Sequence, residues 1–164
     1  MTVTKKIECE TLFGRKKLIS ADEMFFRPSV YGIVLNEDDV LLLDTLHVGG
    51  YSLPGGGVDL GEKMEDALRR EMLEETGVEI DSMEFFQFTE QLFYYDPSDL
   101  AAHCLLFFYL CRPKTLITCT DEQVDDGAVE KPRWVNINGL TPQDFHNAEH
   151  GQLILDGIAK WMEK

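Results

Sequence analysis

Residues 55–78 read GGGVDLGEKMEDALRREMLEETGV, a run of three glycines followed by the strongest helix signal in the chain. From Glu62 to Thr76 there is no proline or glycine, residues that favour helices dominate, and Gly77 stands where a helix C-cap is expected. Successive glycines favour irregular backbone and a close approach to other groups. We therefore expect a loop at Gly55–Gly57 and a helix over residues 62–76.

Three glutamates share one side of this expected helix. Glu71, Glu74 and Glu75 stand at i, i+3 and i+4, beside the apolar Leu68 and Met72. Carboxylates gathered at the border of a buried face repel one another, and a hard divalent cation relieves that repulsion. Mg²⁺ commonly takes one or two carboxylates together with substrate phosphates. A solvated acidic surface is the alternative for the glutamates alone, but the adjacent glycine run favours a site for a cation and a phosphate.

Length and composition limit the fold and the partners. The 164 residues suit a single domain, 1–164, and the formal net charge of −15 argues against long DNA or RNA as a partner. No apolar run is long enough to span a membrane, and residues 1–6 lack the apolar core of a signal peptide. The four cysteines contain no C-x-x-C pair. We expect a cytoplasmic protein without a membrane partner.

Apolar and polar patterning predicts strands on both sides of the central helix. A polar turn at residues 36–39 separates two aliphatic segments that read as a buried hairpin, and helical spacing returns near the C-terminus with Ile154, Ile158, Trp161 and Met162. Thr141-Pro142 resembles a helix start. Alternating strands and helices predict a mixed sheet covered on both faces. The expected strands are residues 7–13, 17–26, 29–35, 40–43, 85–95, 102–111 and 133–137. Within the second of these, residues 20–23 could equally open a helical turn.

From Gly56 to Val78 the sequence resembles the signature of the Nudix hydrolases at every position. The residues that carry the resemblance are Gly56, Glu62, Arg70, Glu71, Met72, Glu74, Glu75, Gly77 and Val78. The flanking segments 51–56 and 133–135 resemble the family as well, so the likeness covers roughly residues 27–140. It implies an α/β fold, the Nudix-type α/β/α sandwich with a mixed β-sheet.

The resemblance also implies an activity and a metal site. Members of the family cleave a nucleoside diphosphate linked to another moiety, by attack of water on phosphorus with Mg²⁺ or Mn²⁺. Such a substrate is a nucleoside triphosphate, a nucleotide sugar or a dinucleoside polyphosphate. The implied metal ligands are Glu71, Glu74, Glu75 and the backbone carbonyl of Gly56. Arg70 matches an arginine that orients a glutamate, and Glu62 is expected to shape the loop and the start of the helix.

Some members of the family use a further carboxylate, outside the signature, as metal ligand or general base. Glu130 is our first candidate, because it follows an acidic loop and precedes Trp134 by four residues. Glu122 and Asp125 are alternatives. Glu71 is a further candidate for the general base.

Several residues are candidates for binding a small-molecule nucleotide substrate, although each also suits ordinary packing. These are Arg27, Tyr51, Gly55, Gly56 and His103, with Phe26, Tyr31, His47 and Trp134 as further possibilities. Tyr94 and Tyr95 lie near the position of a tyrosine that marks the dinucleoside-polyphosphate hydrolases of the family. A homodimer is common in this family.

Two other functions compete with catalysis. A binding module that keeps this fold to sense a nucleotide can dispense with the catalytic glutamates, whereas every carboxylate of the signature is present here. Isomerisation of an isoprenoid diphosphate would need a cysteine and glutamate pair that is not recognisable in this sequence. We therefore expect an enzyme of the hydrolase type.

Overall fold

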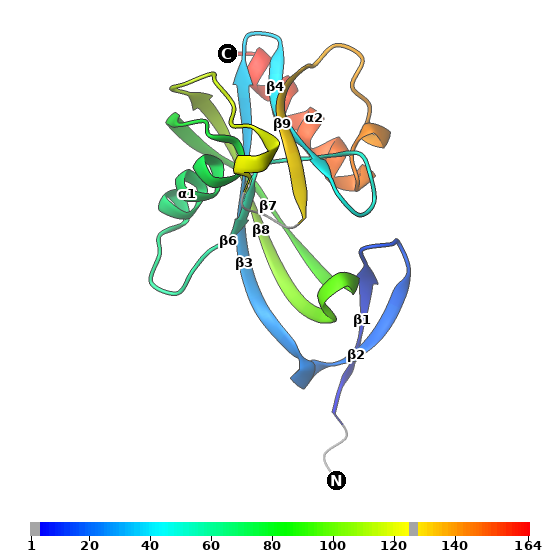
Figure 1. The fold of residues 1–164 in the computed structure, drawn as a ribbon. Helices are drawn as coiled ribbons and strands as arrows, with labels where there is room; N and C mark the ends of the chain where they lie inside the picture. The colour runs from blue at the N-terminus through cyan, green and yellow to red at the C-terminus, as the bar shows by residue number, and fades with distance from the viewer. Residues whose placement is uncertain (1–3, 125–127) are drawn as a thin grey trace.

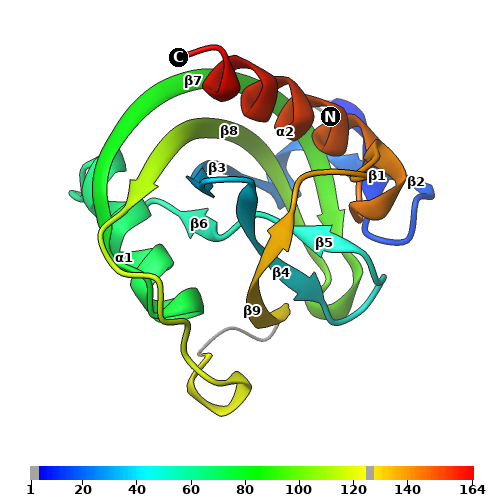
Figure 2. The ribbon, with the colours of Figure 1, turned by 90° about the horizontal axis from the view of Figure 1, so that it is seen from above.

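A strongly curled mixed sheet organises the computed structural model, which describes residues 4–124 and 128–164. The sheet has the order β2-β1-β7-β8-β3-β4-β5, with β6 paired to β3 and β9 paired to β4. Figures 1 and 2 show how far the sheet curls. Its strands are β1 (Lys6–Thr11), β2 (Lys16–Ser20), β3 (Met24–Asn36), β4 (Asp39–Thr45), β5 (Tyr51–Ser52), β6 (Gly55–Gly57), β7 (Ile80–Tyr95), β8 (Leu100–Pro113) and β9 (Val129–Asn136).

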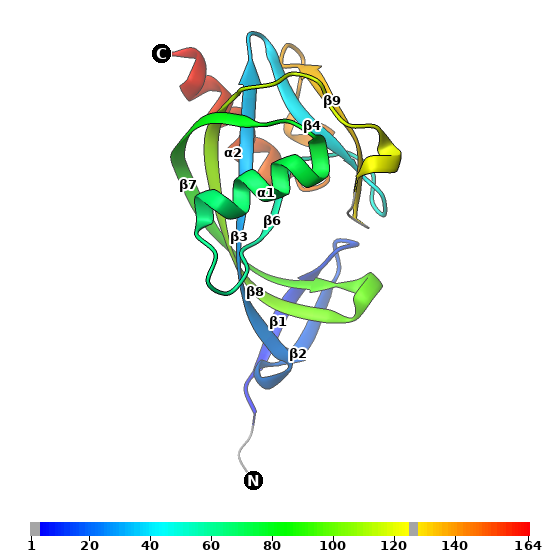
Figure 3. The same ribbon diagram turned by 60° about the vertical axis from the view of Figure 1, so that its left-hand side comes forward.

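Two helices lie on opposite sides of the sheet, α1 (Met64–Thr76) and α2 (Ala148–Met162). Figure 3 shows α1 in front of β3 and α2 behind it. The expected mixed sheet with a helix on each face is therefore confirmed. Among the described residues, no helix is long and apolar enough to cross a bilayer.

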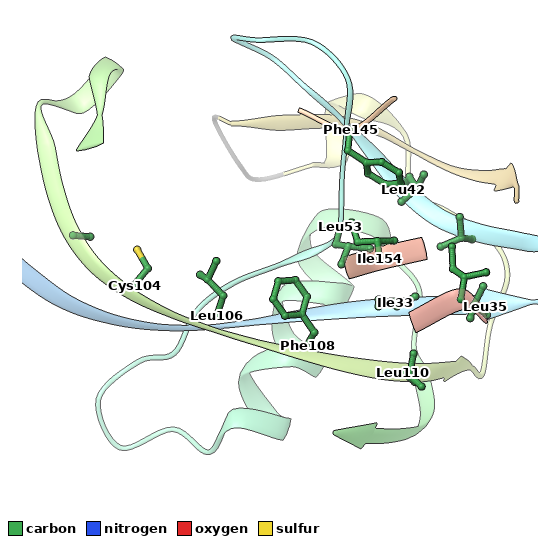
Figure 4. Close-up of a cluster of buried hydrophobic side chains, with 13 residues drawn as sticks. Ile33, Leu35, Leu42, Leu53, Cys104, Leu106, Phe108, Leu110, Phe145 and Ile154 are labelled. Carbon is green, nitrogen blue, oxygen red and sulfur yellow. The ribbon is translucent and has the colours of Figure 1, made fainter. Parts of the chain in front are cut away.

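Alternate residues of β3 and β8 supply the two cores, because successive side chains of a strand point to opposite faces. On the α1 side, Val30 and Val34 belong to a buried cluster with Leu68 and Met72. On the α2 side, a second cluster contains Ile33, Leu35, Phe108, Leu110, Ile154 and Ile158. Figure 4 shows Phe108 and Ile154 in this second cluster. Both helices are thereby fixed against the same two central strands.

Helix α1 ends at the residue that the sequence predicts, but it begins later than predicted. Gly77 has φ +73° and its N–H donates to the carbonyl of Leu73 at 3.0 Å, so glycine provides the left-handed C-cap. The helix begins at Met64, two residues after the predicted start. Glu62 instead closes the preceding turn, where its N–H donates to the carbonyl of Asp59 at 3.0 Å, and its side chain accepts hydrogen bonds from Arg70.

The expectation of an irregular loop at Gly55–Gly57 is wrong, because these residues form strand β6. They pair antiparallel with Ser29, Val30 and Tyr31 of β3. A Cβ atom on Gly55 would lie 2.0 Å from the carbonyl oxygen of Val30, and Gly55 has φ +143°. Only glycine allows this close pairing, so the run serves strand packing as well as access to the backbone.

Other element boundaries differ from the predicted ones where local signals are weak. Strand β7 begins at Ile80, five residues before the predicted start. Within residues 17–26 the alternative of a helical turn is confirmed, because a 3₁₀ turn at Ala21–Glu23 separates β2 from β3. Pro142 begins a 3₁₀ turn, not the terminal helix. That helix starts after Asn147, whose side chain accepts the N–H of His150.

Candidate functional site

The three glutamates of α1 differ sharply in their exposure. The side chain of Glu71 is 13% exposed and that of Glu74 is 49% exposed, whereas Glu75 is 3% exposed as a residue. The expected common face therefore runs from the protein interior at Glu75 to solvent at Glu74. The more buried carboxylates need partners that compensate their charge.

Strand β6 supplies partners for the two more buried glutamates. The N–H of Gly55 donates to Oε2 of Glu75 at 2.7 Å. The carboxylate of Glu71 lies so close to Gly56 that an added Cβ there would be 2.7 Å from its Oε1. The glycine strand and the acidic face of α1 are therefore in direct apposition, as residues 55–78 predict.

Arg70 links the helix to the strand and to the preceding loop. Its Nε and Nη2 donate to the two carboxylate oxygens of Glu62 at 3.0 and 2.9 Å, and Nη2 also donates to the carbonyl of Gly57 at 3.1 Å. Its Nη1 donates to Glu71 at 2.8 Å and to Glu74 at 3.4 Å. These contacts would allow Arg70 to orient the two glutamates and Glu62 to shape the loop, the roles expected for them, which stay predictions.

The electrostatics of this network follow from the same hydrogen bonds. Hydrogen bonds to Glu62 and then to Glu71 raise the pKa of Arg70, so the guanidinium stays charged. The hydrogen bond from Arg70 lowers the pKa of Glu62. One cation thus offsets part of the negative charge that the glutamates bring to α1.

A cavity of about 450 Å³ opens beside this network, a volume typical of small-molecule sites. Most of the residues predicted to bind metal or substrate line it, namely Arg27, Tyr51, Gly55, Gly56, Glu71 and Glu75. Glu74 does not line it and stands at the exposed side of the network.

Glu130 and His103 also lie outside the cavity. Glu130, on β9, pairs with Lys131 at 2.7 Å. The ring of His103 contacts Phe26 and its Nε2 contacts Glu90. His103 precedes the cavity residue Cys104 on β8, so strand alternation turns it to the other face of the sheet.

The remaining candidates also have defined places. Glu122 lies on an exposed 3₁₀ turn and does not line the cavity, and Asp125 lies outside the described residues. Tyr94 is buried and hydrogen bonds to Asp99, whereas Tyr95 lines the cavity with its ring 6.2 Å from that of His47. Of the two tyrosines, only Tyr95 is placed to meet a ligand in this cavity.

Sequence reasoning missed part of the cavity wall. Glu10, Thr11, Leu12 and Gly14 come from the N-terminal hairpin. His146 and Asn147, just before α2, and Glu149 and His150, in its first turn, also line the cavity. No local pattern marks these residues, because only the curl of the sheet brings residues 10–14 and 146–150 to the same space.

The donor atoms fit a hard divalent cation. Among residues 4–124 and 128–164, no three His, Cys, Asp or Glu side chains already converge as a complete metal cluster. Mg²⁺ does not require such a cluster, since it is usually held by one or two carboxylates with waters and substrate phosphates. Glu71, the adjacent backbone of Gly56 and the exposed Glu74 offer oxygen donors of this kind.

Comparisons with known proteins identify one family. The model of the NUDIX domain matches residues 25–156. A nucleoside triphosphatase NudI from Escherichia fergusonii is 30% identical over 67% of this chain and 78% of its own length. An ADP-ribose pyrophosphatase from Methanocaldococcus jannaschii is 34% identical over 46% of this chain and 53% of that protein. The mutator MutT protein of Bacillus halodurans has a similar fold, with a TM-score of 0.63, 20% identity and coverage of 78% and 79% of the two chains.

Proposed function

Because this chain belongs to the Nudix family, we propose that it is a metal-dependent pyrophosphohydrolase that cleaves a nucleoside diphosphate linked to another moiety. The observation that carries this proposal is the apposition of Glu71 to Gly56, with Arg70 joined to both sides of the contact. The relatives named a nucleoside triphosphatase and an ADP-ribose pyrophosphatase support this substrate class.

Family members generally need a divalent metal ion, and we propose Mg²⁺ or Mn²⁺ here. Glu71, Glu74, Glu75 and the carbonyl of Gly56 would hold it. When bound, such an ion neutralises phosphate charge and lowers the pKa of a coordinated water. The chain's own residues do the positioning: Arg70 orients Glu71 and Glu74, and Gly55 holds Glu75.

For the general base, the geometry favours Glu71 over Glu130. Glu71 already lines the cavity, whereas Glu130 would have to leave Lys131 and turn toward it. Arg27 also lines the cavity, and its guanidinium lies against Gly57. We propose that Arg27 contacts a phosphate oxygen of the substrate, because it is a permanent cation beside the glycine strand.

The competing function is a sensor that binds a nucleotide without cleaving it. The carboxylates that a sensor can lose are all present, and Arg70 holds two of them in place. This arrangement favours catalysis. Hydrolysis of phosphoric anhydrides depends mainly on positioning and charge neutralisation, which this network provides.

A screen with metal removal tests the proposal. We expect phosphate or nucleotide release from at least one nucleoside triphosphate, nucleotide sugar, dinucleoside polyphosphate or ADP-ribose. EDTA should abolish this activity, and excess Mg²⁺ or Mn²⁺ should restore it. Turnover that is unchanged in EDTA would contradict the metal requirement, and binding of nucleotides without hydrolysis of any would favour the sensor.

A further inference from the structure

The N-terminal hairpin, strands β1 and β2, lies outside the region that the family model matches, yet it reaches the cavity. Its outer part packs against β7 and β8 through a small buried cluster of Cys9, Ile19, Tyr94 and Ala101. The hairpin therefore has its own anchorage to the sheet. Figure 1 shows it beside the far ends of β7 and β8.

Backbone contacts fix the tip of the hairpin. The N–H of Leu12 donates to the carbonyl of Tyr94 at 3.1 Å and to Oδ2 of Asp96 at 2.9 Å. Thr11 is buried and pairs in register with Tyr94. Leu12 is thus held in one position, as part of the wall of the cavity that also contains Glu71 and Glu75.

A continuous series of ring contacts leads through this cavity, away from the glutamates. The Tyr31 ring stacks on Phe108 at 5.7 Å between centroids, and Phe108 meets His150 edge-on at 6.1 Å. The His150 and His146 rings are 6.3 Å apart, and Nδ1 of His146 is 3.2 Å from the carbonyl oxygen of Tyr51. Flat aromatic walls of this kind suit a flat ligand group.

Charge separates the two ends of the cavity. Arg27 is the single Lys or Arg among the described lining residues, and it lies at the glycine strand. The hairpin and the first turn of α2 contribute the carboxylates of Glu10 and Glu149 instead. These carboxylates would repel a second phosphate group, whereas they would not repel an uncharged group with N–H donors.

The ring nitrogens of His150 are available to hydrogen bond to such a group. In the part of the chain that the structure describes, neither ring nitrogen of His150 has a hydrogen-bond partner. Burial, and secondarily the neighbouring His146, lower the pKa of His150 to about 4. Near neutral pH its imidazole is therefore uncharged and presents one donor and one acceptor.

We propose that the β1–β2 hairpin and the first turn of α2 form a subsite for the nucleobase of the substrate. This inference rests on the proposed function, because the diphosphate is placed at the Glu71 and Gly56 end. Leu12 limits the size of the base, and His150 hydrogen bonds to it. Selection among substrates then depends on residues outside the signature segment.

Calorimetric titration with AMP, GMP, CMP, UMP and ribose 5-phosphate, in the presence of Mg²⁺, tests the subsite directly. These nucleotides differ from ribose 5-phosphate by the base. We expect at least one to bind about tenfold tighter than ribose 5-phosphate, the gain that base stacking typically supplies. If all four bind no tighter than ribose 5-phosphate, the subsite is refuted.

Variants assign the preference to the named residues. We define the base preference as the ratio of the affinity for the best nucleotide to the affinity for ribose 5-phosphate. Leu12→Trp should fill the subsite and remove most of this preference, while the affinity for ribose 5-phosphate changes less than about twofold. His150→Phe keeps a ring but no hydrogen bond, and should lower the preference about fivefold. Leu18→Trp is the matched control, since Leu18 is 65% exposed on the same hairpin and does not line the cavity.

The outcomes separate this inference from the proposed function. A base preference that survives both Leu12→Trp and His150→Phe would overturn the subsite even if the enzyme hydrolyses nucleotides. A base preference that both variants weaken would support it. Should the substrate screen show no hydrolysis in that case, the proposed catalysis fails and the subsite stands as a nucleotide-binding site.

Discussion

Replacing Glu71 with glutamine should lower kcat by about 10²–10³-fold, the loss typical when one major electrostatic contribution to a transition state is removed. Glutamine has nearly the same shape and can still accept the hydrogen bond that Nη1 of Arg70 donates at 2.8 Å. It cannot supply the negative charge next to Gly56 that a divalent cation needs. Steady-state kinetics on the substrate found in the screen measures the effect.

The matched control is Glu65→Gln, the same chemical change on an exposed residue of the same helix that does not line the cavity. Its kcat should stay within about twofold of the wild-type value, because isolated surface charges contribute little. The free energy of unfolding of Glu71→Gln should stay within about 1 kcal/mol of wild type. Near-normal turnover in Glu71→Gln would remove this residue from the metal site and from the role of general base.

Replacing Gly55 with alanine should have the largest effect on stability, a loss of about 3 kcal/mol or more in the free energy of unfolding. The new Cβ would lie 2.0 Å from the carbonyl oxygen of Val30 and 2.7 Å from Cα of Tyr31. Both atoms belong to the backbone of β3, which is paired on its other side with β8 and cannot move aside. Equilibrium unfolding in urea, followed by circular dichroism, measures the change.

Gly61→Ala is the control for backbone strain alone. Gly61 also has a positive φ, +88°, but no atom lies within 4 Å of an added Cβ. This variant should lose only about 1 kcal/mol. Equal losses in Gly55→Ala and Gly61→Ala would show that β6 does not lie against β3 as closely as described.

The sequence predicts the helix and its acidic face well, because those signals are local. At the end of α1, Gly77 adopts the left-handed conformation that C-caps require. The contact between Glu71 and Gly56 could be expected because both residues belong to one recognisable segment. The same holds for Arg70, whose partner Glu62 lies eight residues earlier.

Features that depend on distant pairing could not be predicted in this way. Gly55–Gly57 has the composition of a loop and becomes a strand only because β3 lies beside it. His103 and Cys104 are adjacent in sequence, and only the register of β8 decides which of them faces the cavity. The position of Leu12 opposite α2 depends on the curl of the whole sheet, which no short pattern encodes.

We propose that strand β6 and the glutamates of α1 together hold a divalent cation on a diphosphate. Anomalous diffraction from crystals soaked with Mn²⁺ and a non-hydrolysable nucleotide tests for this cation. We predict a Mn²⁺ peak within bonding distance of Glu71 and of the Gly56 carbonyl, and no peak there in Glu71→Gln crystals. A cation bound elsewhere, or one that persists there in the Glu71→Gln variant, would show that Glu71 and Gly56 do not form the metal site.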